Sequence, residues 1–460
     1  MSAAEITTAV TSGETTALSV TEATLARIAE RNGALNAFTD ITAERALAKA
    51  AAVDAAIASG EDPGPLAGVP FAVKNLFDIE GVTTRAGSRI NRDLPPASSD
   101  ATLIANLEAA GAVLVGALNM GEYAYDFTGE NAHDGASVNP HDLSRMSGGS
   151  SGGAGSAVAG GLVPLALGSD TNGSIRVPSS FCGIFGLKPT YGRLSRSGSF
   201  PFVASLDHLG PFARSVADLA LAYDVMQGAD QSDPAQTPRP VERCSDRIDA
   251  GATGLRIARL GDYFTKGAGE AALSALDAVS AALDVTRDIA LSHAGEVRSA
   301  AYLITMAESG ALHRETLKTR ADDYDQDVRD RLLAGALLPA EWVVTAQKVR
   351  RAFAQEMVEV FRKVDVLLAP ATPCTAPKLG EKWLNLGGDP VPLRPNIGVF
   401  TQPISAIGLP VVAVPVWPKG SALPIGIQVI APPWREDLAL RVARHLERLG
   451  TVASPMAGGS

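Results

Sequence analysis

Cysteine is scarce in this chain of 460 residues, and histidine is scattered along it. The three cysteines, Cys182, Cys244 and Cys374, are odd in number and widely spaced, which excludes a disulfide framework and a cysteine-ligated zinc site. The six histidines include no His-Glu-x-x-His pair, so a histidine-ligated metal is not predicted. Few cysteines are typical of proteins of the reducing cytoplasm, where we expect this protein to reside.

An excess of positive charge and long apolar segments are also missing. The 40 Lys and Arg residues against 50 Asp and Glu residues give a formal net charge of −10, which excludes nucleic-acid binding as the main role. The longest stretches without a charge or a hydroxyl group, residues 157–168 and 406–418, are too short to cross a bilayer and contain Gly or Pro. The first residues lack the pattern of a signal peptide. We therefore expect a soluble protein with no membrane role.

The composition is that of a folded protein with a large core. Hydrophobic residues make up 46% of the chain and charged residues 20%, which excludes a disordered chain, a coiled coil and collagen. Length alone predicts about three domains of roughly 150 residues, but large α/β enzymes often exceed that size in one unit.

Helical and strand patterns alternate in the first part of the chain, which indicates the α/β class. The first 60 residues are helical in pattern, and shorter apolar runs follow them. The expected elements are a helix capped by Ser19 and running to about Asn32, an Ala-rich helix at 43–59, strands at 69–73 and 112–116, and a helix near 100–110.

The stretch 231–253, rich in Pro, Asp and Arg, has the least regular pattern and is expected to be a loop. Further strands are expected at 255–260, 364–370, 410–415 and 424–430, with a closing amphipathic helix at 435–449. Because candidate strands lie on both sides of the loop, we expect one large sheet. The chain is then a single domain of residues 1–460, with an N-terminal helical segment of about 1–60 and a core of 61–460.

Residues 144–183 form a block rich in Gly and Ser. Apolar segments interleave with the glycines, which excludes a flexible linker and indicates glycines placed for tight turns. Ser150 lies in Gly-Gly-Ser-Ser-Gly-Gly, which can present a hydroxyl to a reactant or form a plain turn. Ser174 lies in Asp-Thr-Asn-Gly-Ser, whose backbone N–H groups can form an oxyanion hole. A phosphate cradle is not predicted, because no Gly-x-x-x-x-Gly-Lys-Ser/Thr occurs.

Lys74 directly follows the apolar run at 69–73. A buried Lys has a lowered pKa and can act as a base; the alternative is that its stem packs and its ammonium reaches water. A nucleophilic Ser needs a base. Ser150 matches the letters of the Gly-x-Ser-x-Gly elbow, but residues 141–147 are polar and lack a strand pattern. A Ser–Lys system is therefore favoured over a Ser-His-Asp system.

Three elements together resemble the amidase signature family: Lys74, the glycines around Ser150, and Ser174 in Asp-x-x-Gly-Ser-Ile-Arg-x-Pro. The two serines are 24 positions apart, as in that family, and the likeness continues through 185–193, 205–207 and 408–410. It covers essentially the whole chain. The resemblance implies an amidase that acts on linear amide C–N bonds. It also implies one α/β/α domain around a large mixed sheet, with no metal or organic cofactor.

The resemblance assigns roles to individual residues. Ser174 resembles the nucleophile and Ser150 the bridging serine, which usually follows a cis peptide bond. Lys74, neutral in the resting enzyme, takes the proton through Ser150, and water releases the acyl-enzyme. The expected oxyanion-hole and supporting residues are Thr171, Asn172, Gly173 and Ser151.

The chain departs from the family at two positions, with Asn172 where many members have Gly and Asn75 where many have Asp. Asn tolerates left-handed backbone geometry, so we expect the oxyanion turn to survive. These departures, with residues 199–210 and 332–340, are similar to a subgroup, the 1-carboxybiuret hydrolases. The similarity implies a small carboxylated urea derivative as substrate and release of ammonia.

Two polar side chains near the site have alternative interpretations. Arg176 is either a clamp for a substrate carboxylate or the partner of Asp170 in a structural ion pair. His208 either belongs to the site or is a structural histidine. Cys182, eight residues after Ser174, is expected in the core.

Other functions remain open at the level of the sequence. The glutaminase (A) subunit of a tRNA-dependent amidotransferase shares the chemistry. Such glutaminases have an acid before the Phe-Thr that is Phe400-Thr401 here, and residues 396–399 contain none. An amidase of other small amides is a further alternative. A non-catalytic scaffold is disfavoured because the Lys and both Ser residues are present.

Two kinds of partner are expected, a small-molecule amide substrate and other protein chains. The resemblance implies a small helical accessory subunit, in a homodimer or a heterotetramer. The sequence offers candidate exposed apolar residues at Trp383, Leu384 and Leu386.

Overall fold

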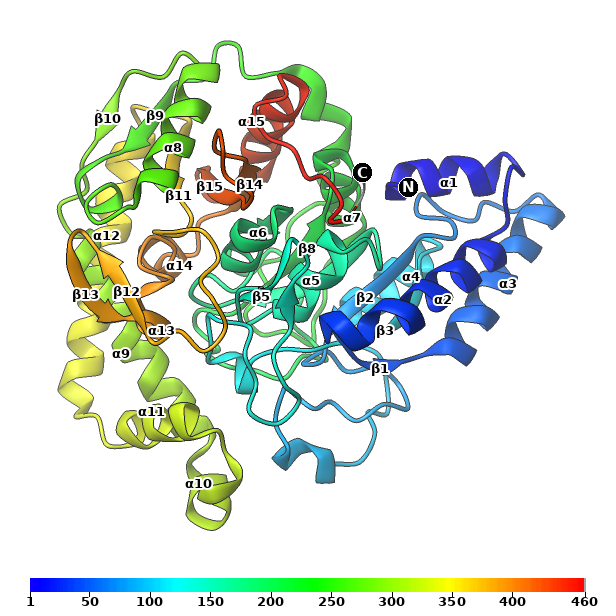
Figure 1. Cartoon of the computed structure of the whole chain (residues 1–460), viewed down its shortest axis with the longest axis horizontal. Helices are drawn as coiled ribbons and strands as arrows, with labels where there is room; N and C mark the ends of the chain where they lie inside the picture. Colours follow the sequence, from blue (N-terminus) through cyan, green and yellow to red (C-terminus); the bar gives the residue numbers. More distant parts are fainter. Residues whose placement is uncertain (459–460) are drawn as a thin grey trace.

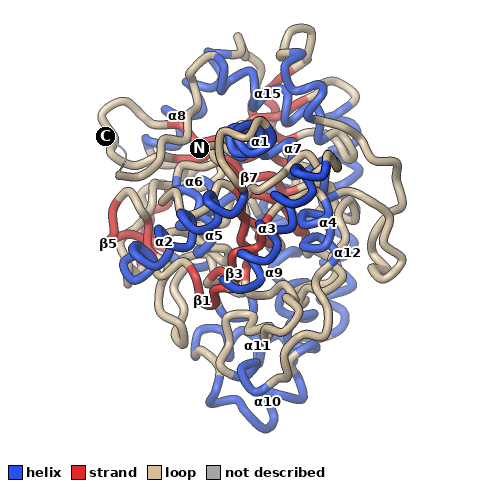
Figure 2. Tube along the Cα trace, turned by 90° about the vertical axis from the view of Figure 1, so that its right-hand side faces the viewer, coloured by secondary structure: helices blue, strands red, loops and turns tan. Residues whose placement is uncertain are grey.

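The structure, a computed structural model, describes residues 1–458. A mixed sheet of 11 strands forms its centre, and helices surround it (Figures 1 and 2). In order across the sheet, the strands are β1 (Phe38–Ile41), β3 (Val113–Leu118), β2 (Pro70–Lys74), β6 (Leu165–Asp170), β8 (His208–Ala213), β7 (Phe185–Lys188), β14 (Val411–Val416), β15 (Ile425–Ile430), β11 (Val366–Pro370), β9 (Ile257–Leu260) and β10 (Asp288–Ile289).

Three parallel strands place the functional residues at one edge of this sheet. β2 pairs in parallel with β3 on one side and with β6 on the other. Lys74 is the last residue of β2, and Asp170 is the last residue of β6. The carboxyl ends of parallel strands meet at the same edge, where ligands bind in open α/β sheets. Lys74 and the turn after Asp170 therefore lie side by side.

Both faces of the sheet are buried. In β11, Val366 and Leu368 pack in the hydrophobic cluster that includes α8 (Glu270–Ala282) and α15 (Glu436–Arg448). The alternating residues Leu367 and Ala369 pack in the cluster of α9 (Ala294–Leu312) and α12 (Ala340–Phe361). Successive side chains of a strand point to opposite faces, so two layers of helices enclose the sheet. The predicted α/β/α architecture is confirmed.

The remaining helices cover the sheet or join its strands. They are α1 (Ala3–Thr11), α2 (Ala17–Leu35), α3 (Ala43–Ser59), α4 (Thr102–Ala109), α5 (Gly152–Ala159), α6 (Arg176–Cys182), α7 (Val216–Met226), α10 (Arg314–Arg320), α11 (Gln326–Ala336), α13 (Leu393–Asn396) and α14 (Gln402–Ala406). Two hairpins complete the fold, β4 (Val138–Asn139) with β5 (Asp142–Met146) and β12 (Trp383–Leu386) with β13 (Asp389–Pro392). No helix within residues 1–458 is both long and apolar enough to span a bilayer.

The N-terminal segment differs from its prediction in two respects. The cap of α2 is Thr16, whose Oγ1 accepts a hydrogen bond from the N–H of Ser19 at 3.0 Å, so the predicted cap at Ser19 is wrong. The helix ends at Leu35 because Asn36 adopts left-handed geometry. Strand β1 also interrupts the segment that was expected to be entirely helical, and it pairs with β3 at the edge of the sheet.

The later elements follow the predicted order. β9, β11, β14 and β15 form close to the expected positions, and they join the same sheet as the strands before the 231–253 loop. This loop contains one short 3₁₀ helix, Ser245–Ala250. The strand β5 lies in a stretch that was expected to lack strand structure. It belongs to a separate hairpin and not to the central sheet, so the prediction for 141–147 is wrong in its local structure.

Candidate active site

Lys74 lies at the centre of a buried hydrogen-bond network. Its side chain is fully buried, and Nζ donates to Oγ of Ser150 at 2.7 Å and to Oγ of Ser169 at 2.9 Å. Burial lowers the pKa of Lys74 to about 7, and the nearby carboxylates, of which Asp207 has the largest effect, oppose this shift. At neutral pH a substantial fraction of Lys74 is therefore uncharged and able to accept a proton.

The backbone before Ser150 is tightly enclosed. The Gly149–Ser150 peptide bond is cis, and Gly148 has a positive φ of 83°. A Cβ atom at Gly149 would lie 2.6 Å from Oδ2 of Asp126 and 2.9 Å from the backbone nitrogen of Gly129. The glycines are therefore required by close backbone approach, as the sequence pattern predicts.

Ser174 lies on the turn that follows β6, and it lines a narrow pocket with 3% of its surface exposed. Gly173 has a φ of 142°, and a Cβ atom there would lie 2.2 Å from Oγ1 of Thr401. Only glycine fits this position. Asn172 does not adopt a positive φ, so the turn forms without left-handed geometry at this position, and Gly173 supplies the unusual backbone conformation.

The turn presents a series of free backbone donors. Within residues 1–458, the N–H groups of Thr171, Asn172, Gly173 and Ser174 donate no hydrogen bond to the protein. Side-chain contacts hold the turn in place: Oγ1 of Thr171 donates to Asp207 at 2.6 Å, and Oγ1 of Thr401 donates to the carbonyl of Asn172 at 2.7 Å. Fixed N–H groups of this kind can stabilise an oxyanion.

Ser151 joins the two serine segments. Its Oγ donates to the carbonyl oxygen of Ser169 at 3.2 Å and accepts from the N–H of the same residue at 3.4 Å. Ser169 in turn accepts from Lys74. Ser151 thus contacts the strand that carries the Ser174 turn, while its neighbour Ser150 contacts the base. Ser169 was not identified from the sequence, because its role depends on the pairing of β2 with β6.

Arg176 is fully buried, which contradicts its prediction as a substrate clamp. Its Nε and Nη2 donate to the two oxygens of Asp170, each at 2.9 Å. The remaining hydrogen bonds go to the carbonyl of Thr401 and to the side chains of Gln428 and Ser405. All three guanidinium nitrogens are therefore occupied by the protein, and the alternative interpretation, a structural ion pair, is correct.

His208 is likewise a buried structural residue. Its Nδ1 lies 3.0 Å from the carbonyl oxygen of Asp170 and 2.6 Å from that of Leu206. Burial lowers the pKa of His208 well below its usual value, so it is neutral. It does not line the pocket of Ser174. Cys182 is in the core as expected, where burial raises the pKa of its thiol.

The pocket of Ser174 draws residues from regions that carry no local sequence signal. Its lining comes from the segment after β3, from α9, from α11 and from the segment that follows β13. The lining residues not expected from the sequence are Ala124, Tyr125, Asp126, Phe127, Phe202, Tyr302, Thr305, Arg331, Arg394, Pro395 and Gln402.

Two arginines of this pocket differ in their partners. Arg394 lies 3.2 to 3.3 Å from the carboxylates of Asp126, Glu130 and Asp327, which neutralise it. Arg331 donates to two backbone carbonyls, and its guanidinium carbon lies 4.0 Å from the ring centroid of Tyr125. It forms no salt bridge with any residue of 1–458. Arg331 is thus a positive group at the pocket without an acidic partner.

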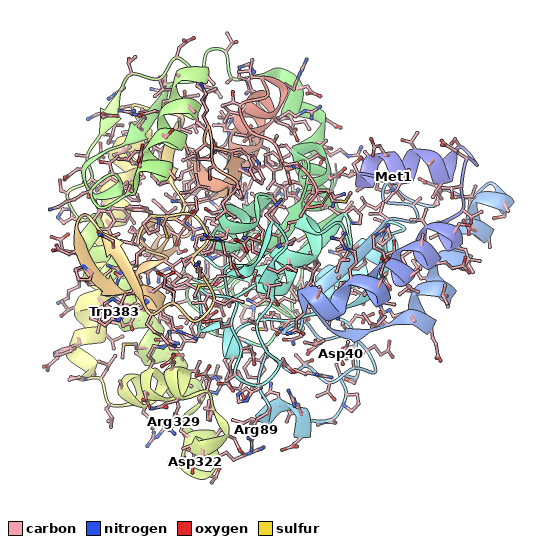
Figure 3. The ribbon with its side chains drawn as sticks, in the orientation of Figure 1. Met1, Asp40, Arg89, Asp322, Arg329 and Trp383 are labelled. Atoms are coloured by element: carbon pink, nitrogen blue, oxygen red, sulfur yellow. The ribbon has the colours of Figure 1, made fainter. Side chains whose placement is uncertain are left out.

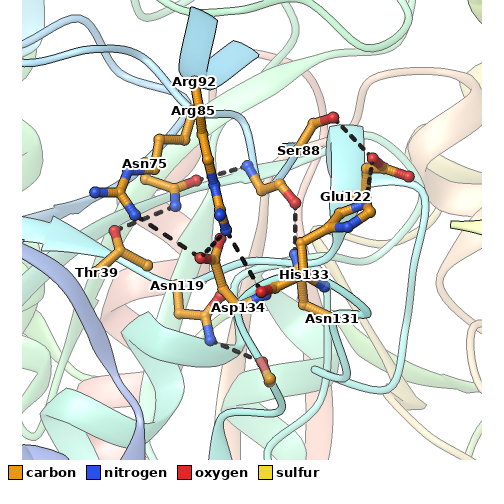
Figure 4. Close-up of polar contacts among 12 residues, drawn as sticks. Thr39, Asn75, Arg85, Ser88, Arg92, Asn119, Glu122, Asn131, His133 and Asp134 are labelled. Atoms are coloured by element: carbon orange, nitrogen blue, oxygen red, sulfur yellow. Dashed lines mark hydrogen bonds and ion pairs between the residues drawn. The ribbon is translucent and has the colours of Figure 1, made fainter. Parts of the chain in front are cut away.

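Glu122 holds one wall of the pocket in place. The side chain is 1% exposed, and Oε1 lies 2.8 Å from both Oγ of Ser88 and Nε2 of His133 (Figure 4). Oε2 accepts a hydrogen bond at 2.7 Å from the N–H of Asp325, the N-cap residue of α11. The helix that carries Arg331 is thereby attached to the segment that carries Tyr125.

Asn75, the second departure from the family pattern, has structural contacts. Its Oδ1 accepts from the N–H of Gly87 at 3.0 Å, and its Nδ2 donates to Oγ1 of Thr39 at 3.3 Å (Figure 4). Asn75 thus ties the segment after β2 to β1. It does not line the pocket of Ser174.

The stretch 396–399, which contains no acid before Phe400-Thr401, packs against an aromatic ring at Gly398. A Cβ atom at Gly398 would lie 2.4 Å from the ring of Phe127. A side chain at position 398 would therefore clash with Phe127, which lines the pocket. In residues 1–458 no group of three or more His, Cys, Asp and Glu side chains is arranged to hold a metal ion.

The apolar residues near Gly387 differ in exposure. Trp383 is 62% exposed at the outer surface of the β12–β13 hairpin (Figure 3). Leu384 is 8% exposed and packs in a small core cluster with Leu393 and Ile397. Leu386 is partly buried against that cluster. The expectation of three exposed residues is therefore wrong for Leu384 and Leu386.

Comparison with known proteins identifies relatives over nearly the full length. The amidase family profile matches residues 19–440. The chain is 51% identical to AtzE, a 1-carboxybiuret hydrolase subunit of Pseudomonas sp. (strain ADP), across 98% of this chain and 99% of the relative. It is 40% identical to the A subunit of the glutamyl-tRNA(Gln) amidotransferase of Anaeromyxobacter sp. (strain K), across 94% and 93%.

Solved structures give the same result. A structure described as a vestigial protein complex of an s-triazine catabolic enzyme superposes with a TM-score of 0.97 at 50% identity, across 98% of this chain and 99% of that chain.

Proposed function

This chain belongs to the amidase family and is an amidase acting on C–N amide bonds, and we propose that its substrate is a small carboxylated urea derivative such as 1-carboxybiuret, from which it releases ammonia. The hydrogen bond of 2.7 Å between Lys74 and Ser150, beside the turn that carries Ser174, is the observation that best supports this reaction. A relative with 51% identity belongs to a 1-carboxybiuret hydrolase.

In the proposed acylation step, neutral Lys74 takes the proton of Ser150 while Ser150 takes the proton of Ser174. Oγ of Ser174 attacks the scissile carbonyl carbon, and the negative charge that develops on the oxygen is stabilised by the free N–H groups of 171–174. The proton then passes from Lys74 through Ser150 to the leaving nitrogen, which departs as ammonia. The product of this step is an ester between Ser174 and the acyl group.

In the proposed deacylation step, water replaces the departed ammonia. Lys74, again neutral, accepts a proton from the attacking water through Ser150, and the same N–H groups stabilise the second tetrahedral intermediate. Collapse of this intermediate returns a proton to Ser174. The cycle uses only side chains and backbone groups of this chain, together with water.

The unpaired charge of Arg331 is an argument for a negatively charged substrate. A guanidinium without an acidic partner, half-buried beside the candidate nucleophile, can pair with a substrate carboxylate. Arg394 cannot do so equally well, because three acidic side chains already surround it. Arg331 thus takes the role that the sequence had suggested for Arg176.

Glutamine hydrolysis is the second candidate and is not favoured. The chain is 40% identical to the A subunit of an amidotransferase, so the chemistry is compatible. However, residues 396–399, before Phe400-Thr401, contain no acid to bind the amino group of glutamine.

For partners, we propose a small helical accessory subunit. The proposed assembly is a homodimer or a heterotetramer, and the proposed location is the cytoplasm. The exposed Trp383 and the protein complex seen in a 50% identical structure support an additional chain.

The test is ammonia release from a panel of 1-carboxybiuret, biuret, allophanate, malonamate and glutamine, with the Ser174→Ala variant as the blank. We expect the carboxylated ureas to have the highest kcat/KM. A preference for glutamine, or equal rates on biuret and 1-carboxybiuret, would contradict the proposal.

A further inference from the structure

Asn172 has a buried polar atom that the protein leaves unpaired. Its side chain lines the same pocket as Ser174 and is 7% exposed. Nδ2 donates a hydrogen bond of 2.9 Å to Oγ1 of Thr305 on α9. Oδ1 is buried and has no hydrogen-bond partner within residues 1–458. Buried acceptors in native proteins are normally paired, so this atom requires an explanation.

The neighbouring side chains do not supply a donor to this oxygen. Oε1 of Gln402 accepts from Arg298, Arg394 pairs with three acids, and Arg331 donates to two backbone carbonyls; none of the three side chains donates to Oδ1 of Asn172. A ligand in the pocket can supply the N–H group that this oxygen lacks. Since Asn172 precedes Ser174 by two residues on one tight turn, such a donor belongs to the part of the ligand near the scissile carbonyl.

We propose that Asn172 is a specificity residue whose side-chain carbonyl accepts a hydrogen bond from a substrate N–H attached to the scissile carbonyl on its acyl side. The site then selects ureas, which have this N–H, over amides with carbon at the same position. The proposal rests on the proposed function. It also gives a physical reason for the departure from the glycine of many family members, because glycine has no side-chain acceptor.

Allophanate and malonamate form a matched pair of probes. Both have a carboxylate and a terminal carboxamide, and they differ only in the group between them, N–H in allophanate and CH₂ in malonamate. With the CH₂ compound, Oδ1 of Asn172 stays unpaired, and an unpaired buried acceptor is costly.

The variant that tests the proposal is Asn172→Gly, which keeps the backbone donors of the turn. We expect it to lower kcat/KM on allophanate about 10- to 100-fold, and to change kcat/KM on malonamate by less than about threefold. Thr305→Val, which removes the hydroxyl that accepts from Nδ2 of Asn172, should give a smaller loss on allophanate in the same direction. Equal losses on both substrates in either variant would overturn the proposal.

A binding measurement separates this proposal from the proposed function. In the Ser174→Ala background, calorimetry should give a weaker Kd for allophanate after Asn172→Gly and an unchanged Kd for malonamate. If the wild type releases no ammonia from any urea while this Kd difference is present, the proposed function is wrong and the role of Asn172 stands. If ureas are hydrolysed and only Tyr125→Phe changes the preference for allophanate over malonamate, the proposal for Asn172 is wrong. The unpaired hydroxyl of Tyr125 is then the group that binds the substrate N–H.

Discussion

Asp170 and Arg176 form a doubly hydrogen-bonded ion pair that closes the turn carrying Ser174. The carboxylate lies before the turn and the guanidinium after it, and Oδ2 of Asp170 also accepts from the N–H of Ile175 at 3.1 Å. Burial alone would raise the pKa of Asp170, but the charge and hydrogen bonds of Arg176 reverse this effect and lower it. The pair therefore fixes the positions of Gly173 and Ser174 relative to β6.

Arg176→Met should destabilise the fold and should not change substrate preference. Removal of one partner leaves the Asp170 charge buried, at a cost of about 3–5 kcal/mol in the free energy of unfolding. Urea denaturation measures this cost, and the double variant Asp170→Asn, Arg176→Met should recover part of it. A normal unfolding midpoint together with a selective loss of activity on carboxylated substrates would restore the clamp interpretation.

Ser174→Ala should reduce ammonia release to the uncatalysed background, and Lys74→Ala should reduce kcat by several orders of magnitude, because each removes a reacting group. The matched control is Ser156→Ala. Ser156 is a buried serine of α5 whose hydroxyl has no partner in the described structure, and it lies outside the network. Measured turnover in purified Ser174→Ala would contradict its assignment as nucleophile.

The rate should depend on pH through Lys74. The base must be neutral to accept a proton, and its pKa is about 7, so log(kcat/KM) should rise with unit slope below pH 7 and level off above it. Asp207 favours the charged form of Lys74. Asp207→Asn should therefore lower the pKa of Lys74 and move the acidic limb to lower pH. An unchanged or upward-shifted limb would mean that Lys74 is not the titrating group.

Arg331→Met should raise KM on carboxylated substrates about 10- to 100-fold and leave neutral amides nearly unaffected, because it removes one charge-assisted contact. Arg329→Met is the matched control, since Arg329 lies on the same helix and pairs with Asp330 and Asp322 at the surface. Steady-state kinetics on 1-carboxybiuret and biuret distinguish the two variants. Similar behaviour of both variants would exclude carboxylate recognition by Arg331.

Asp325→Pro should loosen α11, because it removes the N–H that donates to Glu122. The φ of −54° at this residue accepts proline, so the substitution acts on the hydrogen bond and not on the backbone conformation. Asp325→Ala keeps the N–H and loses only the side-chain cap. Hydrogen exchange over residues 326–336 should be faster in the proline variant than in the alanine variant. Equal exchange would show that Glu122 does not hold this helix.

The sequence was sufficient to predict elements and site residues where short local patterns determine the chemistry and the backbone geometry. Strands β2, β3, β9, β11, β14 and β15 were predicted from short apolar patterns, and the glycines around Ser150 from their spacing; Lys74 was placed at the end of a strand, with its burial left open. Gly173 illustrates the reason. A positive φ and a close approach of neighbouring atoms both require glycine, so the identity of this one residue indicates the geometry of the turn.

The sequence was not sufficient to predict contacts between segments that are distant along the chain. Arg176 and Arg331 are both arginines in ordinary contexts, and only the three-dimensional structure shows that the first is fully paired and the second is not. Ser169 and Thr305 contact the site through strand pairing and helix packing that no local pattern encodes. Strand β5 was missed because a short polar hairpin lacks the apolar alternation of a half-buried strand.

The packing of α5 has a consequence for the evolution of new activities in this fold. Every residue of this helix is buried, and a Cβ atom at Gly153 would lie 2.5 Å from a backbone oxygen. The Gly/Ser segment that follows Ser150 and Ser151 therefore tolerates almost no larger side chain. The pocket residues Arg331 and Thr305 instead come from α11 and α9, which are partly exposed helices. Directed evolution toward other amides should accordingly collect its substitutions on those helices and leave the Gly/Ser segment unchanged.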